Sequence, residues 1–425
     1  MSDSLSIFLG KTIRRTMLLR GGGSALPGLV MERIHPSFVK NALSGLPLGV
    51  VLVSGTNGKT TTTKMVVDLL AGQGLKVFTN RTGSNFVRGV AAALLSEVDS
   101  TGKLDADIAV LELDEAHAVK FVEQIPPRYS LLLNVMRDQL DRFGEIDTTA
   151  RMLEAVAKAT THKLVLNRED PRIANISKVA PAGVSCSYFG LSDELIHHFP
   201  SDDSLHQEGS SSPKHPPRQR PSVLLKAFKE SKANLVIGGR EYTVNLSING
   251  IYNIYNSAAA LAMVREILPK ASLGSLLNSL SKTTPAFGRG EKLIINGQPL
   301  EIILVKNPSG FRLSLRSFKA IGHASLIAIN DEYADGRDMS WLWDVDFSSL
   351  EGNPVSVSGL RAYDIALRLQ YENVPVSNVE TNLKKALTHF LSTYKSQPKH
   401  IFCTYTAMLE IRKQLSKITD VEVVQ

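Results

Sequence analysis

A short glycine-rich loop between an apolar run and a helical run constrains this chain more than any other feature. In VVLVSGTNGKTTTTK, residues 50–64, the β-branched run stops at Gly55, and Lys59 with the threonines after it opens a helical pattern. Strand, glycine loop and helix in this order form a P-loop, in which backbone N–H groups and the positive end of the helix bind phosphate oxygens. The sequence therefore predicts an α/β domain with a phosphate site at the end of its first strand.

The loop and the first turn after it supply the predicted phosphate-binding residues. They are Gly55, Thr56, Asn57, Gly58, Lys59, Thr60 and Thr61. We expect the Lys59 ammonium to reach the outer phosphates and the Thr60 hydroxyl to hold Mg²⁺. The alternative is a tight strand-to-helix turn with no ligand, since the longer common form of the loop would carry a glycine at Val53. A second Gly-Lys-Thr, at residues 10–12, has no strand before it, so we expect no phosphate site there.

Short β-branched runs alternate with amphipathic segments from about residue 48, which is typical of a parallel sheet covered by helices. Predicted strands span 50–53, 76–79, 108–113, 131–135, 163–166 and 184–188, and predicted helices include 61–70, 87–95 and 149–159. Residues 197–222 are rich in Ser, Pro, His and charge, so we expect a mobile loop inside this domain. The expected domains are a helical lead-in at 1–47, a central domain at 48–287 and a smaller C-terminal α/β domain at 288–425.

Composition narrows the class of protein. The two cysteines, Cys186 and Cys403, exclude a disulfide framework and a four-cysteine metal site, and we expect both to be buried as small apolar groups. No apolar run is long enough to span a bilayer and no signal-peptide layout opens the chain, so we expect a cytoplasmic protein. The net charge is +7, and no nucleic-acid motif accompanies it.

The densest early basic cluster lies on a predicted helix near the N-terminus. Its members are Lys11, Arg14, Arg15 and Arg20. A solvated surface is the preferred interpretation of this cluster, and contact with a membrane surface is the alternative.

Several stretches besides the P-loop carry a family resemblance. The compact GTNGKTT form resembles the Mur ligase superfamily, which joins amines to carboxylates through an acyl phosphate. The other stretches are similar to the MurT family, the synthetase subunit of the MurT–GatD lipid II isoglutaminyl synthase. They are GGGSALPG (21–28), TNRTGSN (79–85), LELDEA (111–116), NVMRDQLDRFGEIDTTA (134–150), LVKNPSGF (304–311), NDEYADGRDMSWLWDVDF (330–347), SGLRAYDIALRL (358–369) and TYTAMLEIR (404–412).

The resemblance implies a Mur ligase-like fold and an ATP-dependent carbon–nitrogen ligase. Its expected reaction is amidation of the α-carboxylate of D-glutamate in the lipid II stem peptide, through an acyl phosphate. By resemblance, Lys59 and Thr60 bind the ATP phosphates and Mg²⁺, and Glu112 is a second Mg²⁺ ligand. Gln139 stands where Mur ligases usually carry a metal-binding histidine.

Further nucleotide contacts follow from the same resemblance. The residues concerned are Asn167, Asp170, Asn253, Asn256 and Arg289. Helix N-capping is the alternative for the asparagines of GIYNIYN, and a surface salt bridge is the alternative for Arg289. Asp114 and Glu115 are left open as exposed charges or as groups on the substrate side.

Ammonia for such a reaction requires a cysteine nucleophile, and neither cysteine of this chain suits that role. The resemblance implies a separate GatD-like glutaminase subunit, whose Cys–His pair is completed by Asp335 or Asp338; turn formation is the alternative for both aspartates. Trp341 and Trp343 are expected to fill the core of the small domain, with anchoring of the partner as the alternative. We expect lipid II as substrate, no nucleic acid, and at most peripheral contact with the inner face of the membrane.

Two other functions remain open. One is a Mur or folylpolyglutamate-type ligase that adds an amino acid, which KNPSG (306–310) and ADGRD (334–338) argue against. The other is a nucleotide-binding scaffold without ligase activity, against which the retained Lys59, Thr60 and Glu112 argue.

The MurT family carries a four-cysteine zinc ribbon in its central domain, and this chain has no clustered cysteines. We therefore expect purified protein to contain no stoichiometric zinc and to keep its melting temperature in chelator. Elemental analysis and a thermal melt test this. One zinc per chain would contradict the expectation and would point to the histidines within residues 197–222 as ligands.

Overall fold

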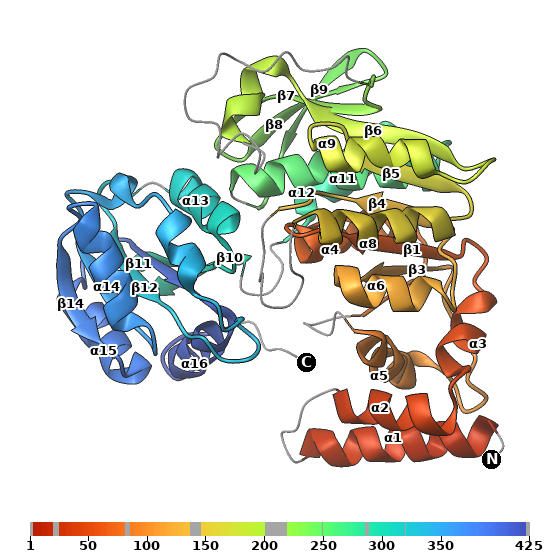
Figure 1. Cartoon of the computed structure of the whole chain (residues 1–425), viewed down its shortest axis with the longest axis horizontal. Helices are drawn as coiled ribbons and strands as arrows, with labels where there is room; N and C mark the ends of the chain where they lie inside the picture. Colours follow the sequence, from red (N-terminus) through yellow and green to blue (C-terminus); the bar gives the residue numbers. More distant parts are fainter. Residues whose placement is uncertain are drawn as a thin grey trace. The chain divides into compact units, whose positions relative to one another are not determined.

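The computed structural model of the chain describes residues 3–19, 25–80, 86–136, 146–199, 219–248, 250–284, 289–318 and 320–421. The chain forms two compact units, each with its own sheet (Figure 1). Unit 1 comprises residues 1–135, 147–247 and 253–283, and unit 2 comprises residues 136–146, 248–252 and 284–425. The sequence predicts domain boundaries after residues 47 and 287. These boundaries stay a prediction.

Unit 1 is built on a nine-stranded sheet with the order β2-β3-β1-β4-β5-β6-β7-β8-β9. Its strands are β1 Val50–Ser54, β2 Val77–Thr79, β3 Ile108–Glu112, β4 Tyr129–Leu132, β5 Lys163–Asn167, β6 Ser185–Leu191, β7 Val223–Lys229, β8 Lys232–Ile237 and β9 Arg240–Asn245. Neighbouring strands from β2 to β7 pair in parallel, and β8 and β9 continue the sheet antiparallel. The central strands β1, β3 and β4 are buried along their whole length, as expected where helices cover both faces.

Helices cover both faces of this sheet. The helices of unit 1 are α1 Asp3–Leu19, α2 Ala25–Ile34, α3 Phe38–Ser44, α4 Lys59–Ala71, α5 Val87–Glu97, α6 Glu115–Val122, α8 Ile146–Ala159, α9 Pro171–Asn175, α11 Ile251–Ile267 and α12 Leu273–Lys282. Figure 1 shows α6, α8 and α9 in front of the sheet and α4, α11 and α12 behind it. Helices α2 and α1 lie beyond α5, so α1 is the outermost layer of unit 1.

The predicted parallel α/β fold is confirmed, with shifts at some strand ends. The fourth predicted strand, 131–135, begins two residues earlier, at Tyr129, and ends at Leu132. A strand buried on both faces has no polar alternation to mark its ends. The predicted loop at 197–222 begins too early, because His197 and His198 belong to a 3₁₀ helix, Asp193–His198. Residues 200–218 of that loop lie outside the described residues.

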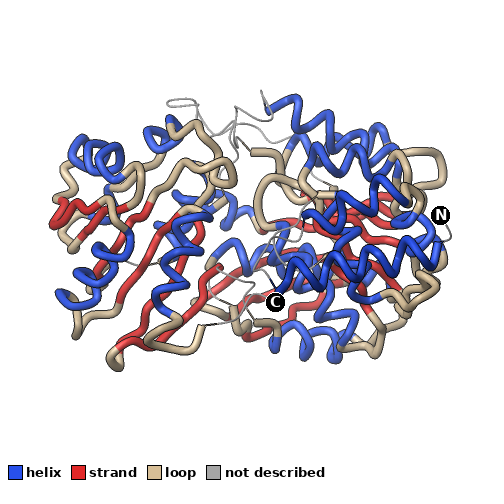
Figure 2. Tube along the Cα trace, turned by 90° about the horizontal axis from the view of Figure 1, so that it is seen from below, coloured by secondary structure: helices blue, strands red, loops and turns tan. Residues whose placement is uncertain are grey.

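Unit 2 is built on a six-stranded sheet with the order β10-β11-β15-β12-β13-β14, parallel except for β10. Its elements are β10 Arg289–Ile295, β11 Gln298–Leu304, α13 Pro308–Ser317, β12 Ala324–Ala328, η3 Ser340–Asp344, η4 Ser348–Leu350, β13 Val355–Ser358, α14 Ala362–Tyr371, β14 Val376–Glu380, α15 Leu383–Thr393, β15 Lys399–Cys403 and α16 Tyr405–Leu415. Helices α13 and α14 pack on one face and α15 and α16 on the other, so each face has its own apolar core. Figure 2 shows the strands of each unit among helices.

The cysteines differ in burial. Cys403 is fully buried at the end of β15, as predicted. Cys186, on β6, is only partly buried, so the expectation of a core position is wrong for it. Among the described residues, no helix is both long enough and apolar enough to cross a bilayer.

Candidate functional site: a P-loop in unit 1 and an aspartate turn in unit 2

The P-loop has two positions that only glycine suits. Gly55 has φ +131° and Gly58 has φ +87°, backbone conformations that L side chains rarely adopt. A Cβ on Gly55 would lie 2.9 Å from the backbone N of Asn134, and a Cβ on Gly58 would lie 2.8 Å from Oδ1 of Asn256. The loop is therefore shaped by close contact with two asparagines from distant parts of the sequence.

Asn134 holds the loop in place through both its backbone and its side chain. The Thr56 N–H donates to the Asn134 carbonyl (2.9 Å), and the Asn57 N–H donates to Asn134 Oδ1 (2.8 Å). In return, Asn134 Nδ2 donates to the Asn57 carbonyl (2.9 Å). Sequence reasoning missed this residue. The available signal was a polar residue just after an apolar strand, at the sheet edge where the P-loop also lies.

Lys59 is buried at the centre of the loop. Its Nζ donates to the carbonyls of Gly55 (2.6 Å) and Thr56 (3.2 Å) and pairs with Glu115 Oε2 at 3.3 Å. Both side chains of this pair are about 95% buried, and a buried charge is costly unless it is paired. Glu115 is therefore not an exposed charge, and the ion pair fixes the lysine head at the loop.

Thr60 and Glu112 meet beside this pair. Thr60 Oγ1 donates to Glu112 Oε1 at 2.8 Å. Asn80 fixes the end of β3, because Glu112 N–H donates to Asn80 Oδ1 (2.9 Å) and Asn80 Nδ2 donates to the Glu112 carbonyl (2.7 Å). Asp114 is also buried, so the exposed alternative is wrong for it too; its Oδ1 has no hydrogen-bond partner in the described part of the chain.

The chemistry of the Thr60–Glu112 pair fits Mg²⁺. A hydroxyl and a carboxylate are hard oxygen ligands, and Mg²⁺ takes one or two protein ligands together with substrate phosphates and water. Within the described residues, no cluster of three or more His, Cys, Asp or Glu side chains is arranged to hold a metal by itself. Thr60 and Glu112 are therefore the residues that would hold the ion.

Asn167 and Asp170 support the chain on either side of Asn134. Asn167 Nδ2 donates to the Leu133 carbonyl (2.8 Å), and its Oδ1 accepts from the Tyr255 hydroxyl (2.6 Å). Asp170 caps α9, and its Oδ2 accepts from Val135 N–H (2.7 Å). Burial raises the pKa of Asp170 to about 6, against the effect of these backbone donors. Both side chains therefore hold Asn134 against the P-loop, and their contact with a nucleotide stays a prediction.

The remaining residues predicted to contact the nucleotide lie in different environments. Asn253 and Asn256 are the third and sixth residues of α11, so N-capping is wrong for both, and Asn256 packs against Gly58. Thr61 is buried in the first turn of α4. The backbone of Arg289 begins β10, and its side chain and Gln139 lie outside what the structure describes.

The two aspartates of unit 2 differ in environment. Asp335 is buried: Oδ1 accepts from Thr406 N–H (2.8 Å), and Oδ2 accepts from Thr406 Oγ1 (2.5 Å) and from Glu332 N–H (3.2 Å). Burial raises the pKa of Asp335. Asp338 is partly exposed, and hydrogen bonds from Ser340 lower its pKa. Asp335 therefore ties its turn to the first turn of α16, and Asp338 is the more exposed of the two carboxylates.

Two tryptophans follow Asp338 closely in the sequence. Trp341 packs against the core, as predicted, but Trp343 is 47% exposed, so the core prediction is wrong for it. The Trp343 ring meets the ring of Tyr371 edge-on at 5.2 Å and lies 5.6 Å from the Arg368 guanidinium. A row of large exposed side chains continues along α14 and the residues just before it, and we call it the α14 stripe. Its members are Leu360, Tyr363, Leu367 and Tyr371.

Comparison with known proteins decides the family. Residues 53–264 match the Mur ligase middle domain and residues 304–408 match the MurT ligase C-terminal domain. The chain is 30% identical to "Lipid II isoglutaminyl synthase (glutamine-hydrolyzing) subunit MurT" of Streptococcus pneumoniae, over 98% of this chain and 97% of that protein. The chain belongs to the MurT family. The protein with the same printed name from Staphylococcus aureus (strain COL) is 28% identical over 98% of both chains.

Solved structures agree on the fold. A pseudomurein peptide ligase type C from Methanothermus fervidus superposes with a TM-score of 0.69 at 21% identity, covering 90% of this chain and 81% of that one. MurF from Acinetobacter baumannii superposes with a TM-score of 0.68 at 18% identity, covering 91% and 80%. This MurT-family chain thus has a Mur ligase fold, and its class of enzyme is the ATP-dependent ligase.

We expect Gly58→Ala to disrupt nucleotide binding because its Cβ meets Asn256. Gly74→Ala is the matched control, since Gly74 has φ +86° and an added Cβ there meets nothing within 4 Å. Both variants carry a backbone cost of about 1–2 kcal/mol because an alanine must adopt a positive φ. Only a loss of stability or of nucleotide affinity greater than that of Gly74→Ala therefore reports the clash with Asn256. Melting temperature and the dissociation constant of a non-hydrolysable ATP analogue measure the effect. If Gly58→Ala binds the analogue as Gly74→Ala does, the contact with Asn256 does not shape the loop.

Proposed function

We propose that this chain is the synthetase subunit of a lipid II isoglutaminyl synthase. The reaction converts the α-carboxylate of D-glutamate in the stem peptide of lipid II to the amide, with ATP and ammonia as co-substrates. The observation that carries the proposal is the match to the pneumococcal subunit along 98% of this chain. The P-loop site, with Lys59, Thr60 and Glu112 gathered at its edge, supplies a place for the chemistry.

The proposed chemistry has two steps. A carboxylate oxygen attacks the γ-phosphorus of ATP, the bond to ADP breaks, and an acyl phosphate forms. Ammonia then attacks the acyl carbon, phosphate leaves with the bonding electrons, and the nitrogen loses a proton. Lys59 and the N-terminus of α4 stabilise the charge on the phosphoryl group in flight. Mg²⁺ bound by Thr60 and Glu112 would neutralise phosphate charge.

Glu115 gives Lys59 a fixed position for this role. The ion pair and the two loop carbonyls hold the lysine head without a ligand, so little side-chain entropy is lost when phosphate arrives. Asn134 does the same for the loop backbone. The site is therefore organised before ATP binds.

A second subunit is proposed as the source of ammonia. The thiolate is the reactive form of cysteine, and burial raises the pKa of both thiols, Cys186 and Cys403. The printed name of the relatives calls each a subunit of a glutamine-hydrolysing enzyme. A GatD-like glutaminase is therefore the partner we propose.

Asp338 is the better candidate to serve that glutaminase. An orienting carboxylate must be charged and within reach of a histidine on the partner. Asp338 has a lowered pKa and partial exposure, whereas Asp335 is buried and bonded to Thr406.

The α14 stripe supports the same location for the partner. Asp338 accepts from the backbone of Ser340, which begins η3, and η3 carries Trp343 against Tyr371. Arg368 also ties α14 to the residue after η3, through a 2.6 Å bond from Nη2 to the Val345 carbonyl. Exposed Tyr, Trp and Leu side chains in one row are typical of a surface that binds another protein. We propose that the glutaminase packs on the α14 stripe and Trp343.

We expect Lys59→Ala and Thr60→Ala each to lower ATP-dependent amidation by at least about 100-fold, because each contacts charge that grows during phosphoryl transfer. Lys64→Ala is the control, since Lys64 lies on the same helix and pairs with Asp68 one turn further along it. The assay uses lipid II, ATP and ammonium salt, with amino acids tested in place of ammonium. Near-normal activity of either P-loop variant would rule out the mechanism, and turnover with an amino acid instead of ammonium would favour an amino-acid ligase.

We expect Asp338→Asn to lower glutamine-driven amidation by about tenfold or more and to leave ammonium-driven amidation unchanged, since Asn keeps the size but loses the charge that orients the partner's histidine. Asp335→Asn is the comparison. It should lower the free energy of unfolding by about 1–3 kcal/mol through its bonds to Thr406. The ratio of the two activities should not change in that variant. If Asp335→Asn, and not Asp338→Asn, selectively lowers glutamine-driven amidation, Asp335 serves the glutaminase. If Asp338→Asn lowers glutamine-driven and ammonium-driven amidation equally, Asp338 acts in substrate binding instead.

A further inference from the structure

The outer face of α1 exposes large apolar side chains. Leu5 is 53% exposed, Phe8 is 68% exposed and Leu9 is 39% exposed. Residues three and four positions apart on a helix are neighbours, so these three form one surface, which we call the α1 patch. A phenylalanine this exposed costs solvation free energy unless something covers it.

The α1 patch is held by a well-packed helix. Ser6 and Ile7, on the inner face of α1, are buried. A Cβ on Gly10 would lie 2.6 Å from the Met31 sulfur, so α1 packs closely on α2. Lys11 Nζ also donates to the Val98 carbonyl at 2.6 Å, which ties α1 to the end of α5. The exposure of Phe8 is therefore a property of the folded unit and not of a frayed end.

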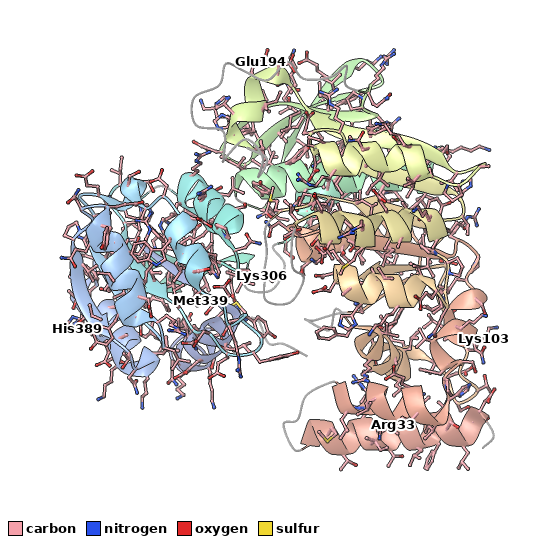
Figure 3. All side chains as sticks on the ribbon, in the orientation of Figure 1. Arg33, Lys103, Glu194, Lys306, Met339 and His389 are labelled. Atoms are coloured by element: carbon pink, nitrogen blue, oxygen red, sulfur yellow. The ribbon has the colours of Figure 1, made fainter. Side chains whose placement is uncertain are left out.

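Basic side chains lie next to the α1 patch. Arg15 is exposed seven positions after Phe8, two helical turns along the same face of α1, and Arg33 is exposed on the neighbouring helix α2 (Figure 3). The described acidic residue of α1, Asp3, lies at the start of the helix, 3.6 Å from His35. The exposed acid of α2, Glu32, pairs with Arg88 at 2.6 Å. The surface around the patch is therefore apolar at its centre and positive at its edge.

We propose that the α1 patch docks this chain on an anionic phospholipid surface. Apolar side chains beside Arg15 on one helix face, with Arg33 on the neighbouring helix, suit the boundary between lipid headgroups and acyl chains. Leu and Phe enter the apolar layer there, and arginines meet phosphates. The net charge of +7 favours the same surface. The proposal rests on the proposed function, because a substrate carried by a lipid must be met at a membrane. Docking is peripheral.

Vesicle sedimentation of the full chain tests this. Wild-type protein should sediment with vesicles that contain phosphatidylglycerol and much less with phosphatidylcholine alone. Phe8→Asp should lower binding by about tenfold. Arg15→Gln with Arg33→Gln should remove most of the salt dependence of vesicle binding. Ile418→Asp is the matched control, since Ile418 is 59% exposed on unit 2, and it should bind as wild type.

Folding is checked by melting temperature, with Leu5→Ser as a milder second variant of the α1 patch. Equal binding of wild type and both patch variants would overturn the proposal, as would equal binding to the two kinds of vesicle. A wild-type dimer in lipid-free gel filtration that Phe8→Asp converts to a monomer would also overturn it, because a second copy of this chain would then cover the patch.

A water-soluble acceptor without the lipid chain separates this proposal from the proposed function. Wild type and Phe8→Asp should amidate that acceptor at the same rate. If neither protein amidates the acceptor, the proposed function is refuted, whereas the vesicle-binding result still supports the docking proposal. Selective loss in Phe8→Asp would overturn the docking proposal, because the patch would then act in the reaction itself.

Discussion

The exchange of hydrogen bonds between Asn134 and the P-loop is the interaction on which the rest of the candidate site depends. Three bonds join Asn134 to Thr56 and Asn57, and they fix the loop before the first turn of α4 begins. The first N–H groups of any α-helix have no acceptor one turn back, so the direction of α4 decides where they point. Asn167 and Asp170 hold the residues on either side of Asn134. The candidate phosphate site is thus built from residues that follow several parallel strands, although the recognisable sequence motif follows only one of them.

Most of the architecture of unit 1 follows from local patterns. β-branched runs and amphipathic segments alternate over many residues, and that period is strong enough to predict a parallel sheet. Strand ends were less predictable, as the two-residue shift of β4 shows. A strand buried on both faces is apolar at its ends as well as in its middle, so its sequence does not mark where it begins or stops. The P-loop was predictable because its glycines, lysine and threonines lie within a few consecutive residues.

The supporting residues were not predictable in the same way. Nothing beside Asn134 in the sequence says that its strand lies next to β1, and nothing beside Glu115 says that it faces Lys59. The environment of Asp335 depends on Thr406, 71 positions away. Trp343 and Trp341 lie two residues apart in one 3₁₀ helix, and only the packing of α14 decides which of them is exposed. These roles arise from strand order and packing, which a local motif does not encode.

The α14 stripe has a consequence for how a cell must produce this chain. Three large side chains on α14, Leu360 just before it and Trp343 on η3 are exposed, and such a surface promotes association with other apolar surfaces while it is uncovered. Chains synthesised in excess over whatever covers the stripe would meet one another through it. Production of this chain in step with whatever covers the stripe would keep the pool of uncovered chains small and limit their loss to aggregation and proteolysis.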